Sequence, residues 1–449
     1  RNQWAFLMLG SLSLAASQWL TLWLLARTAP PGIVGQYGLA LGWLLPACAL
    51  VALQLRPLMA TEPHLDQRLH AYLRLRLVAM GSFVLLLVPL FWIEFPGVGT
   101  GTLLCALGVS RLVELASDFV DALRHRDRSY FDLGVSQCCR SMAGFVAFCL
   151  VWLSMHRLVP AIMAATAAAF CSALLMDLPA LRRSLSRSSE FTWCKWDTAP
   201  EPATAISVER SILVLAAPLA IVHFLNLGVI ALPRLLLGVF SSLEAVAAFT
   251  CLASALGVAS LLSSAYTASL APDLADAFHN QSPSGMSIRE DPHSCVRSSA
   301  TDRAGHLLLR ASRNVCLSAL PLLGILAIGG KPLLRLLYGP GIEFPYWAIV
   351  LTALFATIWG LAAVFGTAAT ATRRIGLQLW AFSLALTSGA AAGALLIPAL
   401  GVVGASASLL ISAIVLLSAY LCAFRNLWFA SRGRVSRSLS KVPCGIVAD

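Results

Sequence analysis

Twelve long runs of apolar residues follow one another along the chain, each about as long as a helix needs to cross a lipid bilayer. They cover roughly residues 4–26, 33–55, 73–94, 98–122, 133–155, 158–181, 211–238, 243–271, 305–329, 346–370, 375–398 and 401–424. Hydrophobic residues make up 58% of the 449 positions and charged residues only 12%, about half the charged share of a soluble domain. The sequence therefore predicts an all-α polytopic membrane protein with about twelve transmembrane helices.

The basic side chains are distributed unevenly over the predicted connections. Of the 32 Lys and Arg residues, 25 fall on connections that share a side with the N-terminus and four fall on the opposite side. Because positively charged loops stay in the cytoplasm, we expect a multi-pass membrane protein with both termini cytoplasmic. The net charge of +11 follows from this distribution, so no nucleic-acid partner is expected. Five tryptophans near span ends are expected to contact membrane lipids at the interface: Trp19, Trp23, Trp92, Trp347 and Trp428.

Two long polar connections divide the chain. The first separates a predicted N-terminal six-helix lobe (1–181) from a C-terminal six-helix lobe (211–424) and forms a cytoplasmic linker (182–210). The second (272–304) is rich in Pro, Ser and Gly and is predicted to be a flexible inner loop of the second lobe, and a basic cytoplasmic tail follows (425–449). The lobes show weak internal similarity, which is typical of transporters with a central cavity between parallel repeats.

The sequence carries no motif of enzymatic chemistry or metal binding. No P-loop, H-E-x-x-H or G-x-S-x-G occurs, and the longest predicted outer connection has Glu343 as its single acid. The 12 cysteines include no C-x-x-C pair and no Cys/His spacing of a metal site. We therefore expect no enzymatic activity, no cofactor and no metal. As a separate expectation, the chain acts as a monomer.

Several stretches, taken together, resemble those of a known transporter family. They read "LLARTAPPGIVGQYGLALGWLLPACALVALQLRPLMAT", "DALRHRDRSYFDLGVSQCCRSMAG", "PLLRLLYGPGIEFPYWAIVLTALFATIWGL" and "LLIPALGVVGASASLLISAI". In this order they are similar to the oligosaccharide (Wzx-like) flippases of the multidrug/oligosaccharidyl-lipid/polysaccharide exporter superfamily. The resemblance implies a V-shaped fold that flips polyprenyl-diphosphate-linked oligosaccharide, the repeat unit of a polysaccharide, across the membrane by alternating access.

Two related classes fit the sequence less well. Lipid II flippases of the same superfamily carry arginines well inside the first span, whereas this span has none before Arg27. Major facilitators also have six plus six spans, but their G-x-x-x-D-R signature is absent from "TEPHLDQRLHAYLRLR". A cation-coupled drug or metabolite antiporter of the same superfamily remains the alternative function.

Charged side chains inside the predicted spans are the candidate functional residues, since each is costly in hydrocarbon without a partner or a ligand. The stretch "SRLVELASDFV" puts Arg111, Glu114 and Asp118 on the fourth span, and their helical spacing places them on one face together with Asp121. The predicted substrate site comprises these three and two further arginines: Arg111, Glu114, Asp118, Arg140 and Arg234.

Two interpretations of these charges remain open. Arg111 can pair with Glu114, and Arg140 with Asp118 or Asp177, as packed ion pairs. Alternatively the arginines line a polar cavity and bind the diphosphate of a lipid-linked sugar, because arginine stays charged and forks onto phosphate oxygens. The candidates for coupling transport to a proton or sodium ion are His223 and Asp177.

Overall fold

The computed structural model describes residues 3–61, 65–92, 100–187, 202–255, 257, 296–372 and 374–439, and no strand occurs in these ranges. The helices are α1 (Gln3–Thr28), α2 (Pro31–Val51), α3 (Leu55–Thr61), α4 (Leu65–Trp92), α5 (Thr100–Arg126), α6 (Tyr130–Met155), α7 (Leu158–Arg187), α8 (Pro202–Phe240), α10 (Val296–Tyr338), α11 (Tyr346–Ala371), α12 (Ile375–Leu400) and α13 (Val402–Leu439). A further apolar helix covers Leu243–Ala255. Prolines stand at the start of two helices: α2 begins at Pro31, and α11 begins directly after Pro345.

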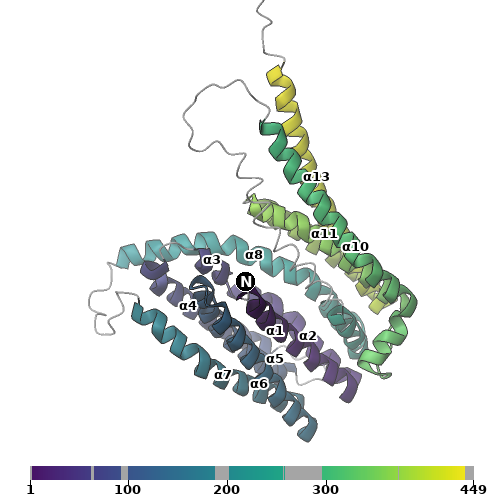
Figure 1. Cartoon of the computed structure of the whole chain (residues 1–449). Helices are drawn as coiled ribbons and strands as arrows, with labels where there is room; N and C mark the ends of the chain where they lie inside the picture. Colours follow the sequence, from purple (N-terminus) through teal and green to yellow (C-terminus); the bar gives the residue numbers. More distant parts are fainter. Residues whose placement is uncertain are drawn as a thin grey trace, which may run out of the picture.

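The helices pack in two groups (Figure 1). Helices α1, α5, α6 and α7 pack on one another in the first, while α8, α11, α12 and α13 do so in the second. Figure 1 shows the groups converging where α1 and α10 end and diverging toward the start of α10 and the end of α13. The chain therefore forms two lobes, which meet where α1 and α10 end (Figure 1) and also along α8, whose first turns pack on α3, α4 and α5.

Helix α2 connects the lobes because it packs mainly against α8. Two glycines make the approach possible. A Cβ atom at Gly35 would lie 2.0 Å from the backbone oxygen of Leu243, and one at Gly38 would lie 2.2 Å from Oγ1 of Thr250. Small residues let helix backbones approach closely in membranes, so the glycine spacing of "PPGIVGQYGLALG" is explained by contact with the second lobe.

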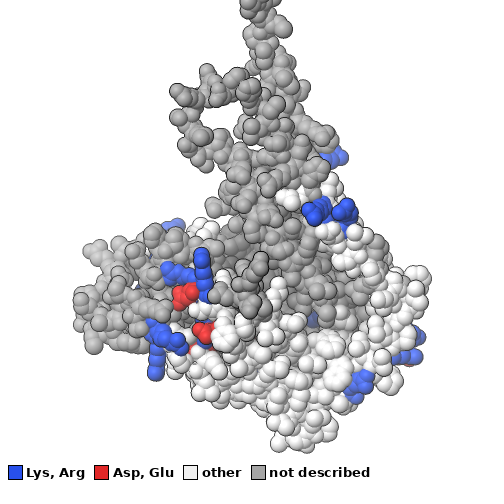
Figure 2. All heavy atoms as spheres, in the orientation of Figure 1, with Lys and Arg blue, Asp and Glu red and all other residues white. Residues whose placement is uncertain are grey.

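Nine helices among the described residues are long and apolar enough to cross a membrane, or ten if the two parts of the bent α10 form one span. Helix α5 is long enough but is not one of them, because its charges lower its hydropathy. On the face shown in Figure 2 most described atoms are uncharged, and the basic side chains lie in small groups. An uncharged surface of this kind suits contact with lipid tails.

The second predicted span ends earlier than expected. Helix α2 stops at Val51, and a turn of three residues leads into α3, which packs against α5. Leu53 and Gln54 of this turn have φ of 53° and 48°, a left-handed conformation that costs energy for residues other than glycine. The turn is held by Arg76, whose guanidinium donates to the carbonyl oxygen of Ala52 at 3.3 Å.

The predicted polar segments are partly helical. Helix α7 continues to Arg187 and α8 begins at Pro202, so both ends of the predicted linker (182–210) belong to helices, and residues 188–201 lie outside the described residues. The predicted flexible loop (272–304) also lies outside them up to residue 295. The predicted tail (425–449) continues α13 as far as Leu439.

Candidate functional site

The first two charged residues of α5, Arg111 and Glu114, form an ion pair within one turn of the helix. Arg111 and Glu114 are bonded through Nη1 and Oε2, as the spacing of three residues predicted. The Arg111 side chain is nearly buried, whereas Glu114 is 38% exposed. Because Nε of Arg111 is buried and has no hydrogen-bond partner among the described residues, the arginine retains capacity for a further acceptor.

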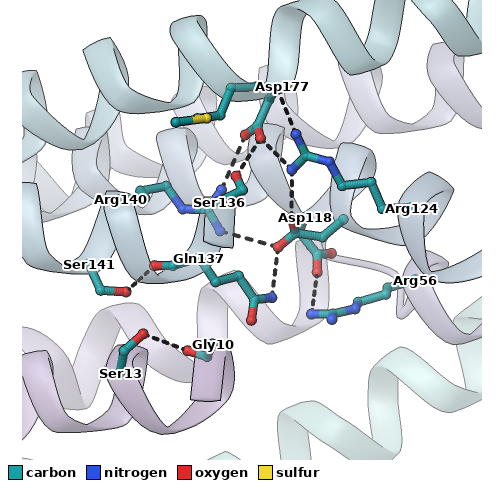
Figure 3. A network of polar contacts seen from close by, with 12 residues as sticks. Gly10, Ser13, Arg56, Asp118, Arg124, Ser136, Gln137, Arg140, Ser141 and Asp177 are labelled. Atoms are coloured by element: carbon teal, nitrogen blue, oxygen red, sulfur yellow. Dashed lines mark hydrogen bonds and ion pairs between the residues drawn. The ribbon is translucent and has the colours of Figure 1, made fainter. Parts of the chain in front are cut away.

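Arg140 of α6 lies between two aspartates of neighbouring helices, Asp121 and Asp177, of which Figure 3 labels Asp177. Its guanidinium is 3.2 Å from Asp121 of α5 and 3.2 Å from Asp177 of α7. Asp177 also accepts from Arg124 at 2.7 Å and from the Ser136 hydroxyl at 2.7 Å. These groups are buried, so Arg140 and Asp177 are paired as structural ions that join α5, α6 and α7.

Asp118 does not pair with Arg140. It contacts two arginines of the preceding helices, Arg76 of α4 and Arg56 of α3, the latter at 3.5 Å. Asp118 and Asp121 are three residues apart, yet Asp118 meets α3 and α4 whereas Asp121 meets α6. The one shared face expected from spacing is therefore divided between two neighbours of α5.

Arg234 of α8 differs from the other two candidate arginines. It is 8% exposed, and among the described residues it has no hydrogen bond or ion pair. Tyr37 of α2 and Cys251 lie within electrostatic range of its charge. Tyr37 is also within electrostatic range of Arg111 and Glu114, so the charges of both arginines act on this buried phenol.

A cavity of about 130 Å³ opens between α1, α2, α5, α6 and α7, large enough for several waters. Arg111, Glu114 and Arg140 contribute to its wall together with Tyr37. Hydroxyl and amide groups make up much of the remainder: Ser17, Gln18, Thr21, Ser110, Ser141 and Thr166. The aromatic rings of Phe145 and Phe148 complete one side. The structure thus brings Arg111, Glu114 and Arg140 together around a cavity whose wall combines polar groups with a larger share of apolar ones.

The remaining candidates lie apart from this cavity. Asp118 faces α3 and α4, Asp177 is enclosed by its partners, and neither contributes to the cavity wall. His223 is half-buried on α8 and has no hydrogen bond or ion pair among the described residues. No geometry within the described ranges links His223 to the ion pairs of the first lobe.

Three arginines that bind these aspartates were predicted from the sequence only as basic residues of inner connections. Arg56, Arg76 and Arg124 were counted for topology, but each contacts an aspartate of α5 or α7. The signal available in the sequence was the placement of opposite charges near the same ends of neighbouring spans. Tyr37 appeared only within a quoted motif, and its exposure to the charge of Arg234 depends on the packing of α2 against α8.

A scan against protein-family models and a search of curated proteins find no match to this chain. Solved structures are similar to it in fold. The lipid II flippase MurJ in an inward closed conformation has a TM-score of 0.64 at 9% identity, over 93% of this chain and 87% of that one. An inward-facing multidrug resistance MATE family transporter of the MOP superfamily has 0.60 at 13% identity, over 98% and 96%. A mutant of the Vibrio cholerae MATE transporter VcmN has 0.59 at 16% identity, over 94% and 95%.

These likenesses define the fold of the chain. At sequence identities this low, the similar structures are evidence for the fold and for nothing beyond it. The matches extend over nearly the whole length of each chain. The chain has the all-helical, two-lobed, twelve-helix fold that MATE and MurJ transporters share. The predicted fold class is confirmed.

Proposed function

We propose that this chain is a membrane transporter that flips polyprenyl-diphosphate-linked oligosaccharide across the plasma membrane by alternating access of its two lobes. The observation that carries the proposal is Arg234, a buried arginine at the junction of the lobes with no anionic partner among the described residues. A cation that has left water without a partner is unfavourable, and a bound anion removes that cost. A diphosphate suits the position because arginine donates two parallel hydrogen bonds to phosphate oxygens.

The carboxylates of the first lobe support an anionic substrate over a cationic one. Each acid of the candidate site has an arginine partner: Glu114, Asp118, Asp121 and Asp177. A hydrophobic cation would need a carboxylate that is not already neutralised. Within the described ranges, the buried charge that lacks a partner, Arg234, is positive, so the electrostatics favour phosphate.

The cavity of the first lobe supports a sugar as the remainder of the head group. Hydroxyl and amide side chains such as Gln18 and Ser110 donate to and accept from sugar hydroxyls, and the rings of Phe145 and Tyr37 offer apolar faces. Arg111 adds a charge to this wall, and Tyr37 of the same wall is within electrostatic range of both Arg111 and Arg234. A diphosphate near Arg234 and Arg111 would thus place its sugar beside polar groups.

A cation-coupled drug or metabolite antiporter is the second candidate. It is favoured by the fold shared with MATE transporters and by Glu114, which lines the cavity and is 38% exposed. In either function a proton or sodium ion would drive the cycle, with His223 as the candidate group outside the ion pairs. We further propose a monomer in the bacterial plasma membrane with both termini cytoplasmic.

The test is a flipping assay in proteoliposomes. A fluorescent undecaprenyl-diphosphate disaccharide is incorporated in both leaflets, and an impermeant quencher reports exchange between them. We expect flipping by the wild type, loss of tenfold or more in Arg234→Ala, and partial activity in Arg234→Lys, which keeps the charge but not the fork. Exposed Arg335 of α10 provides the matched control, since Arg335→Ala should flip normally. Ethidium transport without flipping of the lipid would establish the antiporter instead.

A further inference from the structure

The end of α10 changes direction sharply. Its part at Leu307–Leu326 and its part at Ile328–Tyr338 differ by 76° in direction. Gly329, Gly330 and Pro332 follow the break, and glycine and proline are the usual causes of such a kink. The bent part and the turn that leads to α11, residues 328–344, are called the plug below.

The plug has one buried side and one exposed side. Leu334, Tyr338, Ile342 and Phe344 are at most 2% exposed and belong to a core cluster that includes residues of both lobes, such as Leu22 of α1. The opposite side carries exposed residues of mixed character: Ile328, Lys331, Arg335 and Leu336. The segment is therefore two-sided, with its buried side packed in the core cluster that contains residues of both lobes.

Within the plug, the last turn of helix α10 is held by hydrogen bonds from Arg27 of α1. Arg27 donates through Nε to the carbonyl oxygen of Leu337 at 3.0 Å and through Nη2 to that of Leu336. Carbonyls in the last turn of a helix lack partners within the helix, so the arginine satisfies them. The Arg27 guanidinium also lies over the ring of Trp23, 5.6 Å from its centre.

Tyr338 joins three segments through its hydroxyl. It accepts from Nε1 of Trp19 at 3.2 Å and bonds to the Ser254 hydroxyl at 2.9 Å. Trp19 lies nine residues before the end of α1 at Thr28, about 13 Å along the helix axis. Tyr338 therefore reaches well inside the bundle, and Trp19 bonds within the protein in addition to any contact with the membrane surface.

We propose that the plug is a gate that closes the space between the lobes at the end where α1 and α10 end, and that transport requires it to withdraw. Besides the apolar contacts of its buried side, the described contacts of the plug with the first lobe are the hydrogen bonds from Arg27 and Trp19 of α1. The net contribution of one hydrogen bond to stability is small, so these bonds can break and form in every cycle. By contrast, buried ion pairs such as Arg140 with Asp177 stay within the first lobe and hold it as one body.

The gate can be tested by the accessibility of Cys251, which is fully buried and lies within electrostatic range of Tyr338. A membrane-impermeant maleimide is added to sealed vesicles of each orientation, and peptide mass spectrometry measures the labelling rate of Cys251 in the protein with its native cysteines. Tyr338→Phe keeps the ring and removes the hydroxyl. We expect it to raise labelling from the plug's face about fivefold, the factor that corresponds to one net hydrogen bond.

Arg27→Ala should raise the labelling rate in the same way, and Arg27→Lys should raise it less because the charge remains. Two exposed residues provide matched controls: Tyr346→Phe and Arg335→Ala should label like the wild type. Unchanged labelling in both Tyr338→Phe and Arg27→Ala would overturn the proposal. So would an equal rise in the controls, or an equal rise from both faces of the membrane, which would indicate general loosening. The assay uses no substrate, so its outcome is independent of the proposed function.

Discussion

Asp177 provides the sharpest test of the distinction between structural and functional charges. Its carboxylate is bonded to Arg124 at 2.7 Å, to Arg140 at 3.2 Å and to the Ser136 hydroxyl at 2.7 Å. Hydrogen bonds to charged groups contribute about 1.5–3 kcal/mol each, and removing one member of a buried ion pair costs about 3–5 kcal/mol because its partners stay charged. Asp177→Ala should therefore lower the free energy of unfolding by about 3–5 kcal/mol.

The measurement is thermal unfolding of the purified protein in detergent, together with its abundance in the membrane. Asp177→Asn should be less damaging, since it keeps one acceptor for the arginines. Asp132, an exposed acid in the first turn of α6, provides the control, and Asp132→Ala should change stability by about 0.5 kcal/mol or less. Normal stability of Asp177→Ala combined with lost dependence of transport on a proton gradient would refute the structural role and make Asp177 the coupling group.

Three further outcomes follow from the packing and the sequence. Arg111→Ala should lower abundance, while Arg111→Ala combined with Glu114→Ala should restore abundance in immunoblots and leave flipping defective; full flipping by the double variant would remove Arg111 from the site. Gly38→Val should reduce the monodisperse fraction in size-exclusion chromatography, because its Cβ would lie 2.2 Å from a side-chain oxygen of the second lobe, whereas Gly32→Ala has open space and should not. A reporter fused after residue 200 should be cytoplasmic and one after residue 98 periplasmic, and the reverse result would contradict the orientation.

Much of the fold could be predicted because apolar length alone determines where a membrane helix can lie. The predicted spans at 133–155 and 346–370 correspond to α6 (Tyr130–Met155) and α11 (Tyr346–Ala371). The early end of α2 could not be predicted in this way, since it depends on Arg76 reaching the Ala52 carbonyl from another helix. The predicted span 305–329 ends close to the bend in α10, whereas the helical continuation to Tyr338 was not predicted.

The candidate site was predictable only where its contacts are local. The pair Arg111 and Glu114 follows from a spacing of three on one helix. Arg140 bonds Asp177, one of the two partners that we had considered, and also Asp121. Asp118 instead pairs with Arg76 of α4. This contact depends on which helix packs beside α5, so the pattern of one helix could not predict it. The lack of a described partner for Arg234 is also a property of packing.

The central claim is that Arg234 binds the diphosphate of a lipid-linked substrate. The most direct test is whether such a lipid raises the unfolding temperature of the protein. A ligand that binds the folded state raises its stability in proportion to the logarithm of ligand concentration over Kd. Undecaprenyl diphosphate should raise the unfolding temperature of the wild type, while undecaprenol, which lacks the charge, should not. Arg234→Ala should lose this stabilisation, and Arg335→Ala should keep it. Equal stabilisation by undecaprenol, or full stabilisation of Arg234→Ala by the diphosphate, would contradict the account.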